Sequence, residues 1–162
     1  VPLYGGRGSL LGWVHLSTNP PPAPSLVSAR VSWIKPAVAG GATYPGGFAL
    51  ETTLEGSLYQ RAADMPLLSF TSGTLSLTGG ALSQPVNACA ALTPTNVVFA
   101  CGAQNLSLNF VRSNGTFTGT YLAPDSQTNV RLRGVVLQRQ NRGAGFFRHA
   151  GQSGQLELKP RE

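Results

Sequence analysis

Apolar and polar residues alternate with a period of two over much of this chain. Within several stretches every second residue is apolar, and the residues between are mostly Ser, Thr, Asn, Arg or Gln. A period of two places the apolar side chains on one face of a β-strand and the polar ones on the other. The clearest runs are residues 10–16, 27–33, 74–78, 106–110, 116–121, 130–136 and 155–159. The pattern therefore predicts half-buried strands with one face in solvent.

Turn-forming residues separate these runs. Residues 113–116 read Ser-Asn-Gly-Thr, and Asn-Gly tolerates the positive φ angles that a two-residue hairpin turn requires. Residues 19–24 are rich in proline, which cannot donate to a β-ladder, so they predict an extended surface loop. Only residues 57–63 could hold a short helical turn. Further turns are marked by residues 40–41, 46–47, 79–80 and 141–143.

The number and spacing of these strands predict the fold class. About ten short strands separated by turns are typical of an antiparallel sandwich or barrel. Gly12, Gly119 and Gly134, inside strand patterns, suit the tight bends at barrel corners. Closure also removes exposed edges, which matters in a chain with only 11% charged residues. We therefore expect an all-β fold with one antiparallel β-barrel domain of about 8–10 strands over residues 1–162, and a β-sandwich as the alternative.

The charge balance favours anionic partners without requiring one. The formal net charge is +6, from 12 basic and 6 acidic residues, and ten of the basic residues are Arg. A positive surface attracts acidic glycans, nucleic acid or a membrane surface, but a charge of this size is also what solubility alone requires.

The sequence context predicts a secreted or cell-surface protein. The chain begins at Val1 without Met or a signal peptide, which suggests a processed end or a piece of a longer secreted protein. No run of about 20 apolar residues is present, so we expect no membrane-spanning helix. Low charge with abundant Gly, Pro, Ser and Thr is common in extracellular β-proteins.

Two cysteines, Cys89 and Cys101, predict a disulfide across neighbouring strands. The alternative is two buried free thiols. Closing so short a loop would stabilise the fold by roughly 2–3 kcal/mol in the chain-entropy model. A metal site is not expected, because two cysteines and the distant His15 and His149 lack ligand spacing. We expect no cofactor.

Catalytic motifs are missing from the sequence, so we expect a protein that is not an enzyme. Glu51 and Glu55 would lie about 13 Å apart on one strand face, beyond the roughly 5–9.5 Å that paired glycosidase carboxylates use. Residues 151–155 read Gly-Gln-Ser-Gly-Gln, which places the second glycine one position too early for a serine-hydrolase elbow. Residues 6–12 miss the dinucleotide-binding glycine pattern by one residue, and no helix follows them.

Two groups of residues remain as candidates for binding. Arg side chains suit carboxylate, sulfate or phosphate, and the other interpretation of this Arg cluster is a solvated barrel face. The aromatic residues could stack on sugar rings, although in all-β proteins they are more often core residues. Nucleic acid would need more exposed aromatics among the basic residues, so we do not expect it as a partner. The candidates are Arg131, Arg133, Arg139, Arg142 and Arg148 in one group, and Trp33 and Tyr44, with Trp13 and Tyr59 as further aromatics, in the other.

Several segments together resemble an uncharacterised β-rich, barrel-like domain of large secreted multidomain proteins from environmental bacteria. The resemblance covers nearly the whole chain in order, although residues 146–149 and the segment holding the two cysteines depart from it. It implies secretion, a β-barrel and a modular context, but no activity or functional residue. The matching segments are residues 2–13, 32–36, 44–48, 56–59, 134–141, 143–147 and 151–154.

These observations lead to three hypotheses of function. The first is a non-catalytic structural or adhesive module of a bacterial surface protein, which self-associates through a sheet edge or binds another surface protein. The second is a carbohydrate-binding module for polysaccharide, including acidic polysaccharide. The third is a barrel that holds one small ligand in its mouth.

Overall fold

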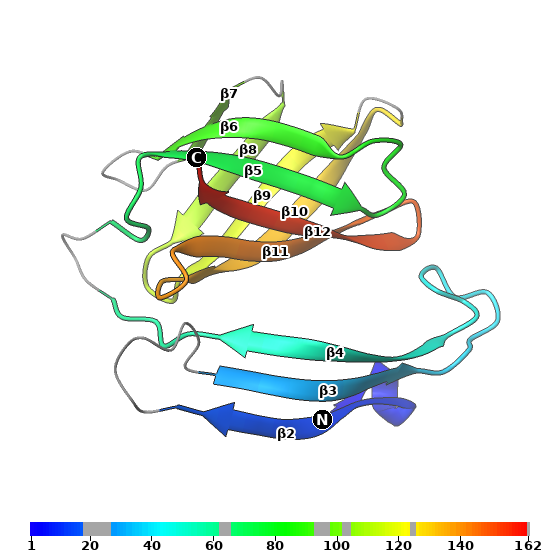
Figure 1. Ribbon diagram of the computed structural model, residues 1–162. Helices are drawn as coiled ribbons and strands as arrows, with labels where there is room; N and C mark the ends of the chain where they lie inside the picture. Colours follow the sequence, from blue (N-terminus) through cyan, green and yellow to red (C-terminus); the bar gives the residue numbers. More distant parts are fainter. Residues whose placement is uncertain (18–26, 62–65, 93–97, 102–104, 124–125, 162) are drawn as a thin grey trace. The chain divides into compact units, whose positions relative to one another are not determined.

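The protein is all-β, as the alternation predicts (Figure 1). The structure, a computed structural model, describes residues 1–17, 27–61, 66–92, 98–101, 105–123 and 126–161. The described residues form twelve strands and one short 3₁₀ turn, and every strand pairing is antiparallel. None of the described residues forms a helix with the length and apolar character needed to cross a bilayer.

The chain divides into two compact units, Val1–Leu58 and Tyr59–Glu162. The first holds a four-stranded sheet and the second a closed eight-stranded barrel. The barrel strands run from Ser72 to Pro160, whereas the sequence prediction extended one barrel over residues 1–162. The difference arises because the first four strands hydrogen-bond among themselves, which alternation alone does not reveal.

The sheet of the first unit has the order β1-β2-β3-β4. Short β1 pairs with the start of β2, and long hairpin-like pairings join β2 to β3 and β3 to β4. The 3₁₀ turn η1, Tyr4–Gly6, connects β1 and β2. The strands are β1 Pro2–Leu3, β2 Gly8–Leu16, β3 Val27–Lys35 and β4 Phe48–Gly56.

The pairing register gives this sheet one apolar and one largely polar face. Directly opposite residues in antiparallel strands share a face, and the face alternates along each strand. We call the first the apolar face; its residues include Leu10, Val14, Leu16, Val27, Ala29, Val31, Trp33, Phe48, Leu50 and Leu54. We call the second the polar face; its residues include Leu11, Trp13, His15, Ser28, Arg30, Ser32, Glu51, Thr53 and Glu55.

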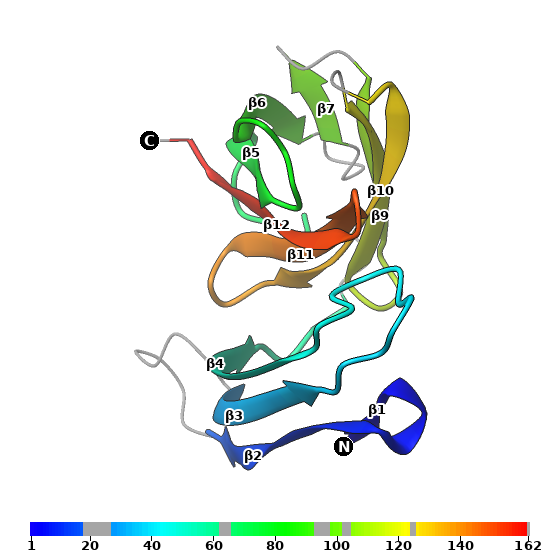
Figure 2. The ribbon, with the colours of Figure 1, turned by 90° about the vertical axis from the view of Figure 1, so that its right-hand side faces the viewer.

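The barrel of the second unit closes in the order β10-β11-β12-β5-β6-β7-β8-β9, and Figure 2 shows its strands curling into a ring. Closure pairs β5 with the C-terminal strand β12, which lie far apart in the sequence. The strands are β5 Ser72–Gly79, β6 Val86–Leu92, β7 Val98–Cys101, β8 Leu106–Val111, β9 Thr116–Ala123, β10 Thr128–Leu137, β11 Arg142–His149 and β12 Gln152–Pro160.

Inward-facing side chains of the barrel form one hydrophobic core. The largest fully buried members are Phe117, Phe147, Leu68, Leu75, Leu77, Leu132 and Leu158. The core also uses interior glycines. A Cβ atom on Gly134 would overlap the ring of Phe117, and one on Gly154 would overlap the ring of Phe147. Alternation of large and small residues in this way fills the taper of a small barrel.

The three glycines expected at barrel corners all lie close to neighbouring atoms. Gly12 belongs to the sheet of the first unit, not to the barrel. Gly119 lies opposite Leu108, and a Cβ there would overlap Leu108 and the carbonyl of Ser107. Gly134 likewise makes room for an aromatic ring. Glycine is therefore needed at these three positions for close packing. The spacing of glycines in the sequence does not distinguish such packing from a bend.

The hairpin at residues 113–116 is confirmed, but its turn differs from the prediction. Val111 pairs with Thr116, so four residues lie between the paired positions and the predicted two-residue turn is wrong. Only Gly115 has positive φ in this loop, while Asn114 Oδ1 accepts hydrogen bonds from the backbone N–H (3.0 Å) and the hydroxyl (2.8 Å) of Thr116. The asparagine thus shapes the loop with its side chain, not with its own backbone.

Two smaller expectations also need revision. Residues 57–61 contain no helical turn; residues 62–63 of that prediction lie outside the described part. The turn expected at residues 141–143 lies earlier, at 138–141, so Arg142 is already the first residue of β11. The proline-rich loop predicted at 19–24 also lies outside the described residues.

Candidate functional site

The arginine candidates belong to the barrel, and they do not form a single cluster. Arg131 and Arg133 alternate with buried Val130 and Leu132 along β10, so both side chains lie on the outer surface. Arg148 is also exposed, on neighbouring β11. These three arginines therefore lie on adjacent strands of one outer face.

The other two arginines have different environments. Arg142 is half-buried and forms an ion pair with Glu157 of β12, with 3.2 Å between Nη1 and Oε1. Lys159 Nζ lies 3.6 Å from the other carboxylate oxygen, so Glu157 contacts two cations. Arg139 is exposed in the β10–β11 turn. The predicted group thus splits into an outer-face set, a paired arginine and a turn arginine.

Trp33 and Tyr44 lie in the first unit and meet around Phe48. The Trp33 and Tyr44 rings both contact Phe48 edge-to-face, with centroid distances of 5.3 and 5.5 Å. Trp33 Nε1–H donates to the hydroxyl of Tyr4 at 3.0 Å, and the Lys35 ammonium lies 5.6 Å from the Tyr4 ring centroid. Trp33 therefore belongs to an aromatic cluster around Phe48, although 37% of it stays exposed.

Of the two interpretations open for Trp13, a core residue or an exposed aromatic, the structure agrees with the second. Trp13 is 93% exposed on the polar face. Alternation does carry the signal, because Trp13 lies out of phase with Leu10, Val14 and Leu16. In contrast, Tyr59 packs against the barrel core and its hydroxyl donates to the Arg112 carbonyl.

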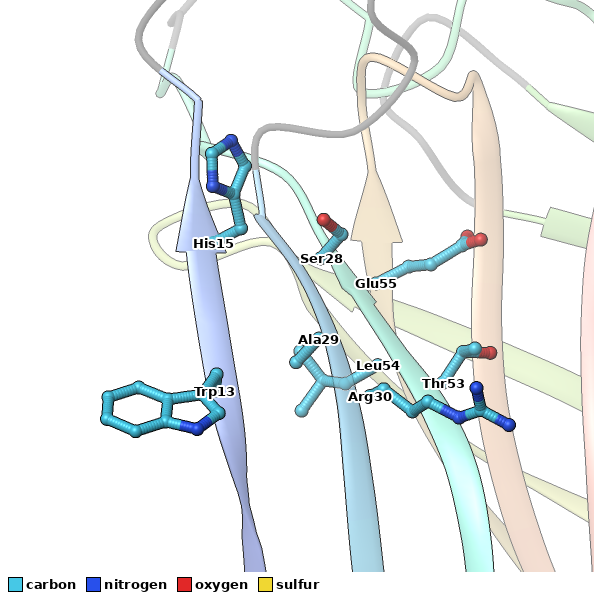
Figure 3. A pocket seen from close by; sticks show the side chains of 8 residues that line it. All are labelled: Trp13, His15, Ser28, Ala29, Arg30, Thr53, Leu54 and Glu55. Carbon is cyan, nitrogen blue, oxygen red and sulfur yellow. The ribbon is translucent and has the colours of Figure 1, made fainter.

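An open groove of about 390 Å³ borders Trp13 on the first unit. Figure 3 shows its lining residues on three neighbouring strands, with the Trp13 indole standing apart from the other side chains. The groove is lined by Trp13, His15, Ser28, Ala29, Arg30, Thr53, Leu54 and Glu55. Arg30 Nε lies 3.2 Å from Glu51 Oε2, and both side chains are mostly exposed. This salt bridge is therefore screened and weak.

His149 has two hydrogen-bond partners that sequence reasoning did not find. Its Nδ1 lies 3.0 Å from the carbonyl oxygen of Gly80, and its Nε2 lies 3.0 Å from Ser126 Oγ. A carbonyl oxygen only accepts, so Nδ1 carries the proton and, in the neutral ring, Nε2 accepts from the serine. A serine beside a histidine is also the arrangement of a nucleophile with its base. The same hydrogen bonds connect three separate segments of the barrel, which is a structural role. Among the described residues, no three His, Cys, Asp or Glu side chains gather as metal ligands would.

Cys89 of β6 lies directly opposite Cys101 of β7 in the antiparallel register. This placement on neighbouring strands is the one that the disulfide prediction required. The side chain of Cys101 lies outside the described part of the structure, so the bond itself stays a prediction.

The described interior of the barrel is filled by core side chains, including Phe117 and Phe147. An eight-stranded barrel is just wide enough for its own side chains to fill it. A small ligand inside the barrel would have to displace these side chains. Comparison of the chain with family models, curated proteins and solved structures finds no match.

Proposed function

We propose that this chain is a non-catalytic structural or adhesive module of a secreted or cell-surface bacterial protein, and that its first unit is an assembly surface. The low charge and the resemblance described above support the location. The observation that carries the assembly role is the apolar face of the four-stranded sheet. Val14 is 55% exposed on this face, Leu16 67% and Leu50 42%.

The size and position of the apolar face favour contact with another surface. Three nine-residue strands spaced about 4.8 Å apart cover roughly 400 Å². The largest apolar patch of a monomeric protein is about 300–600 Å² and is often functional. Ala29 and Val31 at the centre of the face are buried, so the exposed residues surround a packed middle.

A second copy of this sheet is the occupant that fits best. Two apolar sheet faces packed against each other form a β-sandwich, and a two-fold axis lets the same patch serve both copies. The alternative is pairing along the edge strand β4. This strand carries Glu51 and Glu55, and like charges on an edge oppose strand addition. Because each copy buries only a few hundred Å², the association is expected to be weak and to grow with concentration.

Light scattering during size-exclusion chromatography, over a range of protein concentrations, tests this proposal. The average mass of the wild-type protein should rise with concentration. Val14→Lys should abolish the rise, because it places a charge on the apolar face. Leu11→Lys is the matched control, since Leu11 is on the same strand, equally exposed at 56%, and on the polar face.

Each other outcome contradicts the proposal. A wild-type protein that stays monomeric at every concentration has no assembly surface for itself. Equal loss of association in both variants would indicate edge pairing or general charge repulsion. Circular dichroism of each variant confirms that the sheet has folded before its mass is compared.

A further inference from the structure

One row of exposed side chains crosses four strands on the outside of the barrel. In the pairing register Thr118 of β9 lies opposite Arg133 of β10, which lies opposite Phe146 of β11, which lies opposite Gln155 of β12. All four residues are exposed. Directly opposite side chains are about 5 Å apart at Cβ, so the row forms one continuous surface.

Phe146 is the feature of this row that core packing does not explain. Half of the residue (51%) is exposed, while its chain neighbour Phe147 is fully buried. Among the described residues of the barrel unit, Phe146 is the one aromatic side chain with this degree of exposure. A flat ring held on a rigid strand offers a face for another flat or ring-shaped group.

Arg131 and Arg133 supply positive charge beside this ring. They lie two residues apart on one side of β10, which places them about 7 Å apart. In the described part of the chain neither arginine has a carboxylate within ion-pair distance. Glu157, the acid on β12, contacts Arg142 and Lys159. The two guanidinium groups therefore keep their donors for an external anion.

Hydroxyl and amide groups surround the charged and aromatic residues. Thr120 lies opposite Arg131, and Ser107 lies opposite Thr120, with 2.9 Å between the two hydroxyl oxygens. Asn109 lies opposite Thr118. The surface next to Arg131 and Arg133 thus presents neutral groups that both donate and accept hydrogen bonds.

We propose that Arg131, Arg133 and Phe146 form a binding site for an anionic polysaccharide whose sugars carry carboxylate or sulfate groups. The apolar face of a sugar ring stacks on Phe146. The guanidinium forks of Arg131 and Arg133 take the acidic groups, because planar guanidinium matches carboxylate and sulfate oxygens two at a time. Sugar hydroxyls pair with Thr118, Thr120 and Gln155.

The chemistry of the surface favours a glycan over nucleic acid. Proteins that hold single strands stack successive bases on several aromatic side chains along a continuous basic groove. Here one exposed aromatic ring stands among hydroxyl and amide groups, and the described outer face of β9 carries no basic residue. Sparse charge with many neutral polar groups matches a chain of hydroxyl-rich rings with occasional acidic groups.

The test uses the full chain and measures binding to polygalacturonate and heparin, with dextran as the neutral comparison, at low and high salt. Wild-type protein should bind the acidic polymers at low salt, bind dextran much more weakly, and lose most binding at high salt. Arg133→Gln should weaken binding about fivefold to tenfold, because it removes one charged fork. Arg139→Gln is the matched control, since it removes the same charge from the exposed β10–β11 turn, outside the row.

Substitution of Phe146 distinguishes the contribution of ring stacking to binding from that of charge attraction. Phe146→Leu keeps an apolar side chain but removes the ring, so affinity should fall severalfold while the dependence on salt stays unchanged. Thermal unfolding of each variant shows that the barrel is intact, and substitution of exposed residues leaves it so.

Three results would overturn the proposal. The first is no binding to either acidic polymer at low salt. The second is equal weakening by Arg133→Gln and Arg139→Gln, which would indicate diffuse attraction to the net positive charge. The third is tighter binding to a single-stranded oligonucleotide than to the acidic polysaccharides. This site lies on the barrel and does not depend on assembly through the first unit. A strictly monomeric protein would therefore contradict the assembly proposal but not this binding site.

Discussion

Phe117 on β9 lies directly opposite Gly134 on β10, and its ring fills the space that a side chain at Gly134 would need. Phe147 and Gly154 repeat the arrangement between β11 and β12. These aromatic–glycine pairs let an eight-stranded barrel bury two large rings. Their tight fit also makes the core sensitive to small additions of volume.

Gly134→Ala should therefore destabilise the protein by about 1–3 kcal/mol, the usual cost of overpacking a core. Differential scanning calorimetry should show a lower Tm than wild type. Gly46→Ala is the control, because nothing lies within 4 Å of its Cβ position and its φ is not positive. An unchanged Tm for Gly134→Ala would mean that the Phe117 ring and the Ala144 carbonyl can both move aside without cost.

Asn141 offers a separate test of backbone strain. Its φ is +49°, and its Oδ1 accepts a hydrogen bond from the backbone N–H of Ser69 at 2.8 Å. Asn141→Gly removes the hydrogen bond but tolerates the positive φ. Asn141→Ala removes the hydrogen bond and also disfavours the positive φ. We expect the alanine variant to be less stable than the glycine variant by about 1 kcal/mol, measured by urea unfolding. Equal stabilities would show that the left-handed backbone costs nothing at this turn.

The Cys89–Cys101 pair can be tested by mass. Alkylation of the denatured protein without reductant should add no label, because the bond is expected to be closed. After reduction two labels should be added. Replacing both cysteines with serine should lower stability by roughly 2–3 kcal/mol, through the lost constraint on the unfolded chain. Two labels without reductant would contradict the bond.

The Ser126–His149 pair gives a test of the expectation that the protein is not an enzyme. Nucleophilic catalysis would make hydrolysis of an activated ester, such as p-nitrophenyl acetate, depend on the serine hydroxyl. We expect Ser126→Ala and wild type to hydrolyse this ester at the same slow rate. A rate that falls with Ser126→Ala, but not with alanine at another surface serine, would show that the pair is catalytic.

Much of the fold follows from the sequence because a period of two is a local property. Alternation in residues 10–16, 27–33 and 130–136 predicts strands without knowledge of their partners, since side-chain direction within a strand is set by the local backbone. The Asn114-Gly115 hairpin was likewise predictable, although its turn is longer than the two residues expected.

Pairing decided what the alternation left open. Whether β4 continues into the barrel or ends a separate sheet depends on hydrogen bonds between strands, and local pattern carries no information about them. The same holds for the sites. Arg133 meets Phe146 across two strands, and His149 meets Ser126 and Gly80 from three segments.

The amino-acid sequence alone therefore determined that this protein is all-β, where most strands lie, and which residues alternate to each face. Tertiary structure alone decided that eight strands close into a barrel while four form a separate sheet. It also decided that Trp13 is exposed and that Arg133 lies beside Phe146. The physical reason is that side-chain direction is set by the neighbouring peptide units, whereas strand order and register are set by contacts between residues distant in the chain.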